Sequence, residues 1–113
     1  MARIVADSLY GTLNLLILKA LDDGQLHGLQ VARRIQGASR DVLGVEEGAL
    51  YPALHRLERD GLLRGTWGVS DKGRRAKFYE LTAAGRKHLR REVERWTRHT
   101  QAVAQVLALG EAR

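Results

Sequence analysis

The stretch GALYPALHRLERDGLL, residues 48–63, decides the fold, because it holds the clearest helical pattern of the chain and its only proline. Leu50, Leu54 and Leu57 recur at the spacing that places side chains on one face of a helix. Pro52 lies between them, where it removes a backbone donor. An Asp-Gly pair ends the pattern. We therefore predict a helix that carries a proline in its first turns.

Two more helices are expected before this stretch. The first is capped by Asp7 or Ser8 and ends at Gly24, which suits a left-handed C-cap. Its apolar stripe consists of Leu9, Leu13, Leu16, Ile17, Ala20 and Leu21. The second helix covers residues 27–36 and stops at Gly37. Its buried side is expected to contain Leu29, Ala32 and Ile35.

After the third helix the pattern changes from helical to alternating. Residues 62–69 and 76–81 are β-branched, aromatic or alternating, and a Ser-Asp-Lys-Gly turn separates them. This order predicts a β-hairpin. Thr82 then suits the N-cap of a last helix that runs to about Leu109. That helix is too long to pack wholly within a small domain.

Three short helices, a hairpin and a long helix are the element order of a winged helix-turn-helix with an appended helix. The predicted fold class is therefore α+β, mostly α. Within the 113 residues, we assign 1–81 to a winged helix-turn-helix DNA-binding domain. Residues 82–113 are assigned to a C-terminal dimerisation helix and tail.

Four blocks of the sequence resemble the PadR family of bacterial transcription regulators: GTLNLLILKAL, LHGLQVARRIQ, VEEGALYPALHRLERDGLL and WGVSDKGRRAKFYELTAAGRKHL. The resemblance covers residues 8 to about 107, and its most specific part is LYPALHRLE followed by RRAKFYELT. The single, unextended C-terminal helix resembles the short subfamily. The resemblance implies a homodimeric, DNA-binding repressor. Many members of the family respond to small aromatic or cationic compounds or to cell stress.

The formal charge of +6 suits a polyanionic partner, nucleic acid first and acidic lipid second. A well-solvated basic surface is the alternative, because net charge argues only for non-specific attraction. No apolar run approaches the ~18 residues of a membrane span, and the first residues do not resemble a secretion signal. We therefore expect a cytoplasmic protein that does not bind membranes.

The inventory of chemical groups argues against an enzyme. The chain has no cysteine, which excludes disulfides and thiolate sites. The four histidines fall on different elements, except His88 and His99, which are eleven residues apart on one helix and cannot hold one metal. No serine lies in a nucleophile elbow, and no glycine-rich loop suits a phosphate. We predict no catalytic residue, no metal site and no cofactor.

The third helix is expected to contact DNA with its N-terminal half, as recognition helices do. The candidate contacts are Gly48, Tyr51, Pro52, His55, Arg56 and Arg59. Alternatives stay open for most of them. Pro52 could mark the start of the helix and have no other role. The Tyr51 ring could pack on the second helix, and His55 could be a surface residue without a contact. The two arginines could pair with Glu58 or Asp60.

The hairpin is the second candidate DNA contact. Its basic residues are Lys72, Arg74, Arg75 and Lys77, which crowd a tip that has no core to bury them. Such a tip can enter a minor groove, and a solvated tip is the alternative. Tyr79 and Leu81 share one strand face and are expected to point inward. Trp67 is expected to pack against Phe78, with a stacking platform for a ligand or a base as the alternative.

The last helix carries an apolar seam with a period of 3.5 residues, which is typical of helices that pack against a partner. The seam consists of Leu89, Val93, Trp96, Thr100, Val103 and Leu107. We expect these residues to form a homodimer; the alternative is that the helix folds back on its own domain. Trp96 either fills the interface or lines a cavity in which a flat effector stacks.

These observations favour a PadR-like, dimeric repressor of a pseudo-palindromic, double-stranded operator, released by a small-molecule effector or a stress signal. Two other functions stay open. A winged helix could bind RNA or a partner protein without operator specificity. The chain could also be an interaction protein that assembles only through its long helix.

Overall fold

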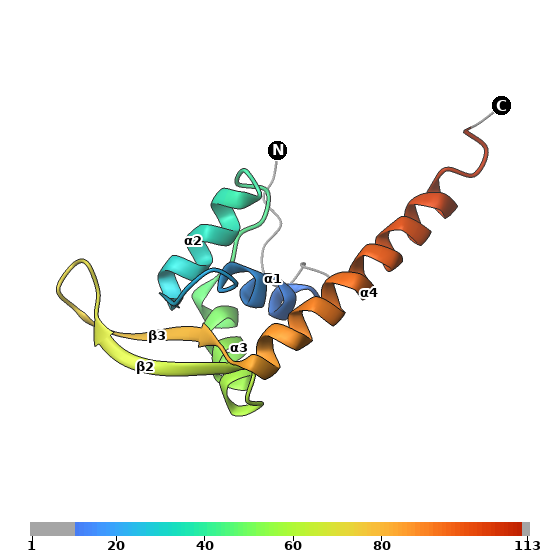
Figure 1. The fold of residues 1–113 in the computed structure, drawn as a ribbon. Coiled ribbons are helices and arrows are strands. Elements are labelled where there is room, and N and C mark those ends of the chain that lie inside the picture. Colours follow the sequence, from blue (N-terminus) through green and yellow to red (C-terminus); the bar gives the residue numbers. More distant parts are fainter. Residues whose placement is uncertain (1–10, 112–113) are drawn as a thin grey trace.

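The computed structural model describes residues 11–111. In this range the chain forms four helices and one three-stranded antiparallel sheet, which confirms the α+β, mostly helical fold class. The elements are α1 (Leu13–Ala20), β1 (Leu26–His27), α2 (Gly28–Ala38), α3 (Glu47–Arg59), β2 (Leu63–Val69), β3 (Arg75–Leu81) and α4 (Ala83–Leu107). Helices α1, α2 and α3 form one body, from which the β2–β3 hairpin projects on one side and α4 on the other (Figure 1).

Helix α3 follows the pattern of the opening stretch. Leu50, Leu54 and Leu57 are buried in the core, and the helix ends before Asp60, as predicted. Pro52 is the sixth residue of the helix, so the alternative that it marks the helix start is wrong. It has no N–H to donate one turn back, and the helix continues because its other bonds and its buried leucines hold it.

The two upstream helices differ from the prediction at their ends and faces. Helix α1 begins after Thr12, and the caps predicted at Asp7 or Ser8 lie outside the described residues, as does Leu9. On α2 the predicted burial of Leu29 is wrong: the side chain is exposed, and Ala32 is only half-buried. The buried residues of α2 are Gly28, Val31 and Ile35. Leu29 lies about 200° around the helix from Val31 and therefore points away from the core.

A short strand that the sequence pattern did not indicate completes the sheet. The strand order is β1-β3-β2, and β1 pairs with β3 through Leu26 opposite Tyr79 and His27 opposite Phe78. Two residues are too few for an alternating pattern, which explains why β1 was missed. The same segment starts α2, because the His27 side chain accepts a hydrogen bond from the Gln30 N–H while the Gln30 side chain accepts one from the His27 N–H.

The hairpin register corrects the predicted aromatic pair. Trp67 lies opposite Lys77, whereas Phe78 lies opposite Thr66. Neighbouring residues of a strand point to opposite faces, so Trp67 and Phe78 cannot pack against each other. The Phe78 ring instead contacts the His27 ring edge-on at a centroid distance of 5.5 Å. Tyr79 is buried on the inner face, as predicted, and so is Leu81.

Helix α4 begins at the predicted cap and is attached firmly to the end of α3. The Thr82 hydroxyl donates to the Gly61 carbonyl at 2.6 Å and accepts from the Gly85 N–H at 3.0 Å. Leu89 is buried in the core of its own domain, so its predicted place in a subunit seam is wrong. Beyond these first turns the helix leaves the body (Figure 1), and Leu107 is 74% exposed.

Candidate nucleic-acid interface

Helix α3, the hairpin and the start of α2 at His27 and Gly28 line a groove of about 320 Å³. Tyr51 and His55 line it from α3, one turn apart, and Trp67 and Arg75 line it from the hairpin. The core leucines occupy the opposite side of α3, which is why these polar and aromatic residues face outward. The structure therefore brings the two predicted contact regions onto the same groove.

Tyr51 combines the two roles that the sequence left open, since its ring packs on α2 and part of its side chain is exposed at the groove. A Cβ on residue 28 would lie 2.7 Å from its Cε1 atom, so the ring packs closely on the first residue of α2. The residue is nevertheless 38% exposed. The ring is thus fixed by Gly28 while part of the side chain stays accessible from the groove.

Pro52 and the two arginines of α3 lie on its exposed surface. Within residues 11–111, neither Arg56 nor Arg59 forms an ion pair within 4.0 Å, so the pairings with Glu58 or Asp60 are not formed. Gly48 is exposed as well, and a Cβ there would meet no atom within 4 Å. Packing in the chain itself therefore does not require a glycine at this position.

Lys77 does not lie at the hairpin tip, which corrects its predicted place. It is the third residue of β3, and its Nζ donates to Glu58 Oε1 of α3 at 2.7 Å. This hydrogen bond raises the pKa of Lys77 and keeps the amine charged. A Cβ on Gly65 would collide with the Lys77 side chain and lie 2.9 Å from Glu58 Oε2. The glycine thus leaves room for an ion pair that joins the hairpin to α3.

The remaining basic residues of the hairpin differ in how firmly they are held. Lys72 and Arg74 are exposed at the turn, where they form no ion pair within the described part of the chain. The Arg75 guanidinium instead lies 4.4 Å from the centre of the Trp67 ring, a cation–π contact. Trp67 is 57% exposed, so it presents Arg75 from an open surface and does not bury it.

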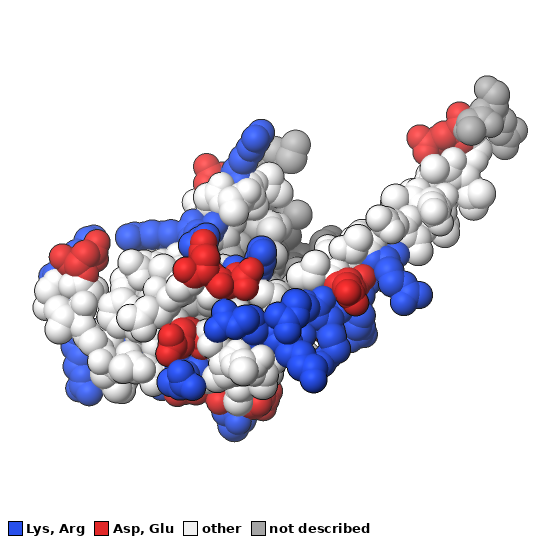
Figure 2. All heavy atoms as spheres, in the orientation of Figure 1, with Lys and Arg blue, Asp and Glu red and all other residues white. Residues whose placement is uncertain are grey.

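A second group of basic side chains was missed by sequence reasoning. Figure 2 shows Lys and Arg side chains gathered along the first half of α4. The group consists of Arg86, Lys87, Arg90, Arg91, Arg95 and Arg98. Its signal in the sequence is the recurrence of cations at three- and four-residue spacing, on positions outside the apolar seam.

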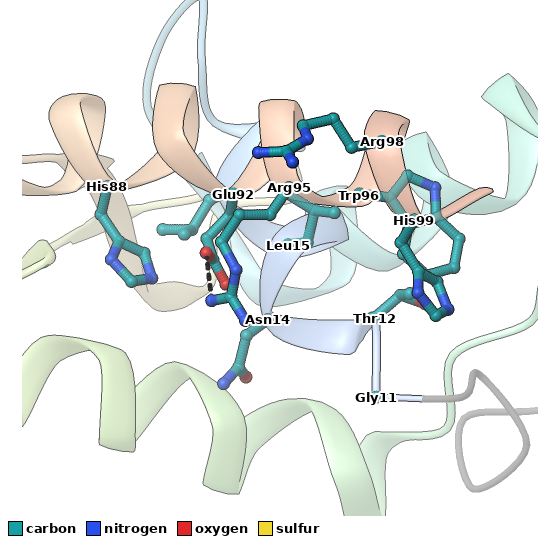
Figure 3. Close-up of a pocket in the computed structure, with 11 residues that line it drawn as sticks. Gly11, Thr12, Asn14, Leu15, His88, Glu92, Arg95, Trp96, Arg98 and His99 are labelled. Carbon is teal, nitrogen blue, oxygen red and sulfur yellow. Dashed lines mark hydrogen bonds and ion pairs between the residues drawn. The ribbon is translucent and has the colours of Figure 1, made fainter. Parts of the chain in front are cut away.

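A larger cavity, of about 640 Å³, lies between the start of α1 and the middle of α4 (Figure 3). Trp96 and His99 line it from α4, with their ring centres 5.8 Å apart. Arg95 also lines it and donates to Glu92 Oε2 at 2.9 Å. Helix α1 and the residues before it contribute Gly11, Thr12, Asn14, Leu15 and Leu18. The cavity thus combines an aromatic wall with several charged or polar groups.

Comparison with known proteins identifies the family. The profile described as "Transcriptional regulator PadR-like family" matches residues 17–91, which include the second half of α1, α2, α3, the hairpin and the start of α4. The chain belongs to the PadR-like family of transcriptional regulators. It is therefore a DNA-binding transcription regulator and not an enzyme.

Relatives of this PadR-family chain agree with that assignment. The "Transcriptional regulator Rv3488" of Mycobacterium tuberculosis is 42% identical over 73 residues, which are 65% of this chain and 64% of that protein. A solved transcriptional regulator from Clostridium thermocellum has a TM-score of 0.78 at 25% identity and covers 88% of this chain and 97% of its own. A PadR-like regulator from Bacillus cereus has a TM-score of 0.75 at 25% identity, with coverages of 90% and 97%.

The described residues offer neither a membrane-spanning helix nor a metal site. No helix in the range 11–111 is long and apolar enough to cross a membrane. The same residues contain no group of three or more His, Cys, Asp or Glu side chains that could hold a metal ion.

Proposed function

We propose that this PadR-family regulator is a cytoplasmic homodimeric repressor that places α3 of each subunit in the major groove of a pseudo-palindromic operator. The observation that carries the proposal is the shared groove of α3 and the hairpin, which Tyr51, His55 and Arg75 line without an ion pair to any of residues 11–111. Tyr51, Pro52 and His55 are positioned to reach base edges, and Arg56 and Arg59 to reach phosphates. The free space at Gly48 supports a close approach of the backbone to the duplex.

The hairpin adds contacts that position the protein without reading sequence. Lys72 and Arg74 at the tip are proposed to bind phosphate or to enter the minor groove. Arg75 is proposed to make the same kind of contact while its guanidinium stacks on the Trp67 ring. The ion pair of Lys77 with Glu58 limits the reach of Lys77 and fixes the angle between the hairpin and α3. Lys77 therefore contributes to DNA binding mainly by holding the hairpin against α3 and by placing a positive charge next to the groove.

Changes in helix α3 and in the hairpin are expected to have different effects on DNA binding. Replacing His55 with alanine, or Tyr51 with phenylalanine, should weaken operator binding about tenfold and leave binding to mixed-sequence duplex nearly unchanged, because base contacts carry the specificity. Replacing both Arg74 and Arg75 with alanine should weaken both kinds of binding alike. The measurement is affinity for each duplex across a range of salt concentrations.

The salt dependence provides the control for this comparison. With about four to six phosphates neutralised per dimer by α3 and the hairpin, the slope of log K against log salt for a duplex limited to the operator should be near −4 to −5. The hairpin variant should reduce it by up to about two, and the α3 variants should not change it. Equal losses of specificity from both sets would show that the reading surface is assigned wrongly, and a flat salt response would exclude the electrostatic contacts.

The exposed part of α4 is the proposed dimer contact. Val93, Trp96, Val103 and Leu107 are all exposed along one side of a helix that leaves the body. Apolar residues at this spacing support pairing with a second copy, and Thr100 lies in the same row. The division into a DNA-binding part (1–81) and a dimerisation part (82–113) stays a prediction, and the burial of Leu89 ties the two parts together.

The cavity next to Trp96 is the proposed site of the releasing effector. Its volume of about 640 Å³ lies in the range of small-molecule sites, and Trp96 is 40% exposed there. A flat aromatic compound stacked on this ring would contact both α1 and α4. It could thereby change the distance between the two recognition helices of a dimer.

Replacing Trp96 with alanine is expected to abolish release by the effector, while Val93, Val103 and Leu107 still hold the dimer on the operator. The probes are benzoate and a cationic acridine dye, added to the preformed complex. In a Trp67→Phe variant, Trp96 is the only tryptophan left, so quenching of its fluorescence reports binding directly. A variant that loses the dimer and DNA binding together would show that Trp96 only fills the interface. One that still responds to the probe would place the effector elsewhere.

A further inference from the structure

Three basic residues form a row along the side of α4 opposite the buried Leu89, and the last of them, Arg98, also lines the cavity next to Trp96. Lys87, Arg91 and Arg98 lie about 160°, 200° and 180° around the helix from the buried Leu89. We call these three residues the basic stripe. From first to last they are eleven residues apart, or about 16 Å along the helix axis.

The basic stripe has no ion-pair partner among the residues that the structure describes. All three residues are exposed, and none forms an ion pair within 4.0 Å in residues 11–111. Arg95, the neighbouring cation, is paired with Glu92. Glu94, the other carboxylate of the helix, lies about 140° from Leu89, beside Arg91 and Arg98, but forms no ion pair within 4.0 Å in residues 11–111. With six basic and two acidic residues, α4 has a net charge of +4, most of the +6 of the whole chain. The net positive charge thus lies mainly on α4 and on residues 63–81, where five basic and two acidic residues leave a net charge of +3.

The position of the basic stripe keeps it accessible, and its helix starts at residues bound to the segment that follows the recognition helix. It lies opposite the apolar side of α4, so pairing of the apolar sides in a dimer would leave it exposed. The first turn of α4 is bound to the end of α3, because Thr82 hydrogen-bonds to the carbonyls of Gly61 and Leu62. Arg56 and Arg59, which have no ion pair within the described residues, lie at the end of α3. These hydrogen bonds therefore join them to the helix that carries the stripe.

We propose that the basic stripe binds the phosphates of duplex DNA outside the segment contacted by α3 and the hairpin. This inference rests on the proposed function, since it extends the same DNA complex. The chemistry is that of a backbone contact: exposed Lys and Arg without acidic partners and no aromatic platform among them. Because DNA carries one charge per strand about every 3.4 Å, a row about 16 Å long can meet several phosphates.

The test compares the parent with the triple variant Lys87→Gln, Arg91→Gln and Arg98→Gln on mixed-sequence duplexes of about 20 and 40 base pairs. On the longer duplex we expect the parent to have a steeper slope of log K against log salt than on the shorter one. The triple variant should lose this difference, a reduction of about three per protomer at ~0.9 for each lost phosphate contact. On the shorter duplex the two proteins should behave alike.

The matched control removes the same charge elsewhere, with Lys19→Gln, Arg33→Gln and Arg40→Gln, which are exposed on α1, on α2 and just after α2. It should keep the parent slope; an equal reduction would overturn the proposal in favour of an effect of net charge alone. A triple variant with the parent slope on the longer duplex overturns it too, and a simultaneous loss of binding to phosphatidylglycerol vesicles would assign the stripe to lipid.

If the triple variant does not fold, the single variant Arg91→Gln should lower the slope by about one, and an unchanged slope counts against the stripe. A parent that binds neither duplex contradicts the proposed function itself.

Discussion

Replacing Gly85 with alanine is expected to lower the free energy of unfolding by about 2–3 kcal/mol, because the new methyl group would collide with backbone and not with a movable side chain. Gly85 is buried at the third position of α4, where a Cβ would overlap the Leu62 carbonyl oxygen and lie 3.3 Å from the Leu62 Cα. The same carbonyl accepts the Thr82 N–H at 3.1 Å. The substitution therefore forces α4 away from the end of α3 at the junction that holds it.

Thermal unfolding followed by circular dichroism measures this effect, with an expected fall of about 10 °C in Tm. The matched control is Gly37→Ala in α2, where a Cβ would meet no atom within 4 Å and the backbone has no positive φ. That change should raise stability by up to about 1 kcal/mol, since alanine is the better helix former. A Gly85→Ala variant as stable as the parent would show that α4 can shift without cost. Equal destabilisation of both variants would show that the Leu62 contact is not the cause.

Replacing Val103 and Leu107 together with glutamate is expected to convert the proposed dimer into monomers and to weaken operator binding at least a hundredfold. Both residues are exposed on the part of α4 that leaves the body, about 40° apart around the helix. Four carboxylates brought together in the dimer would repel one another in a contact that excludes water. Each monomer would then hold a single half-site, and the gain from binding two linked half-sites would disappear.

The measurements are sedimentation velocity for the oligomeric state and affinity for the operator. The control variant, Gln101→Glu with Gln105→Glu, adds the same charge at about 160° and 200° from Val103, on the opposite side of the helix. It should remain dimeric and lose only the modest affinity that added negative charge costs. A Val103/Leu107 variant that stays dimeric would place the subunit contact elsewhere. A parent that is monomeric yet binds the operator tightly would exclude the dimer altogether.

The sequence by itself determined the elements that depend on short-range spacing. The leucine pattern and the Asp-Gly stop predicted the core face and the end of α3, and Thr82 was correctly predicted as the cap of α4. The hairpin was predicted within one residue at each end. These signals work within about one helical turn or one strand pair, so they can be read without knowing how the elements meet. The same holds for the family blocks, which are local strings of residues.

The candidate site depended on tertiary structure wherever two distant elements meet. Trp67 supports Arg75 and not Phe78, because the register of β2 against β3 decides which residues share a face. Lys77 pairs with Glu58, nineteen residues earlier, and no local pattern indicates that contact. Leu89 fits a 3.5-residue seam, yet the Thr82–Gly61 bond draws the first turns of α4 onto the body and buries it. Periodicity states which side of a helix is apolar, but only the path of the chain decides what that side packs against.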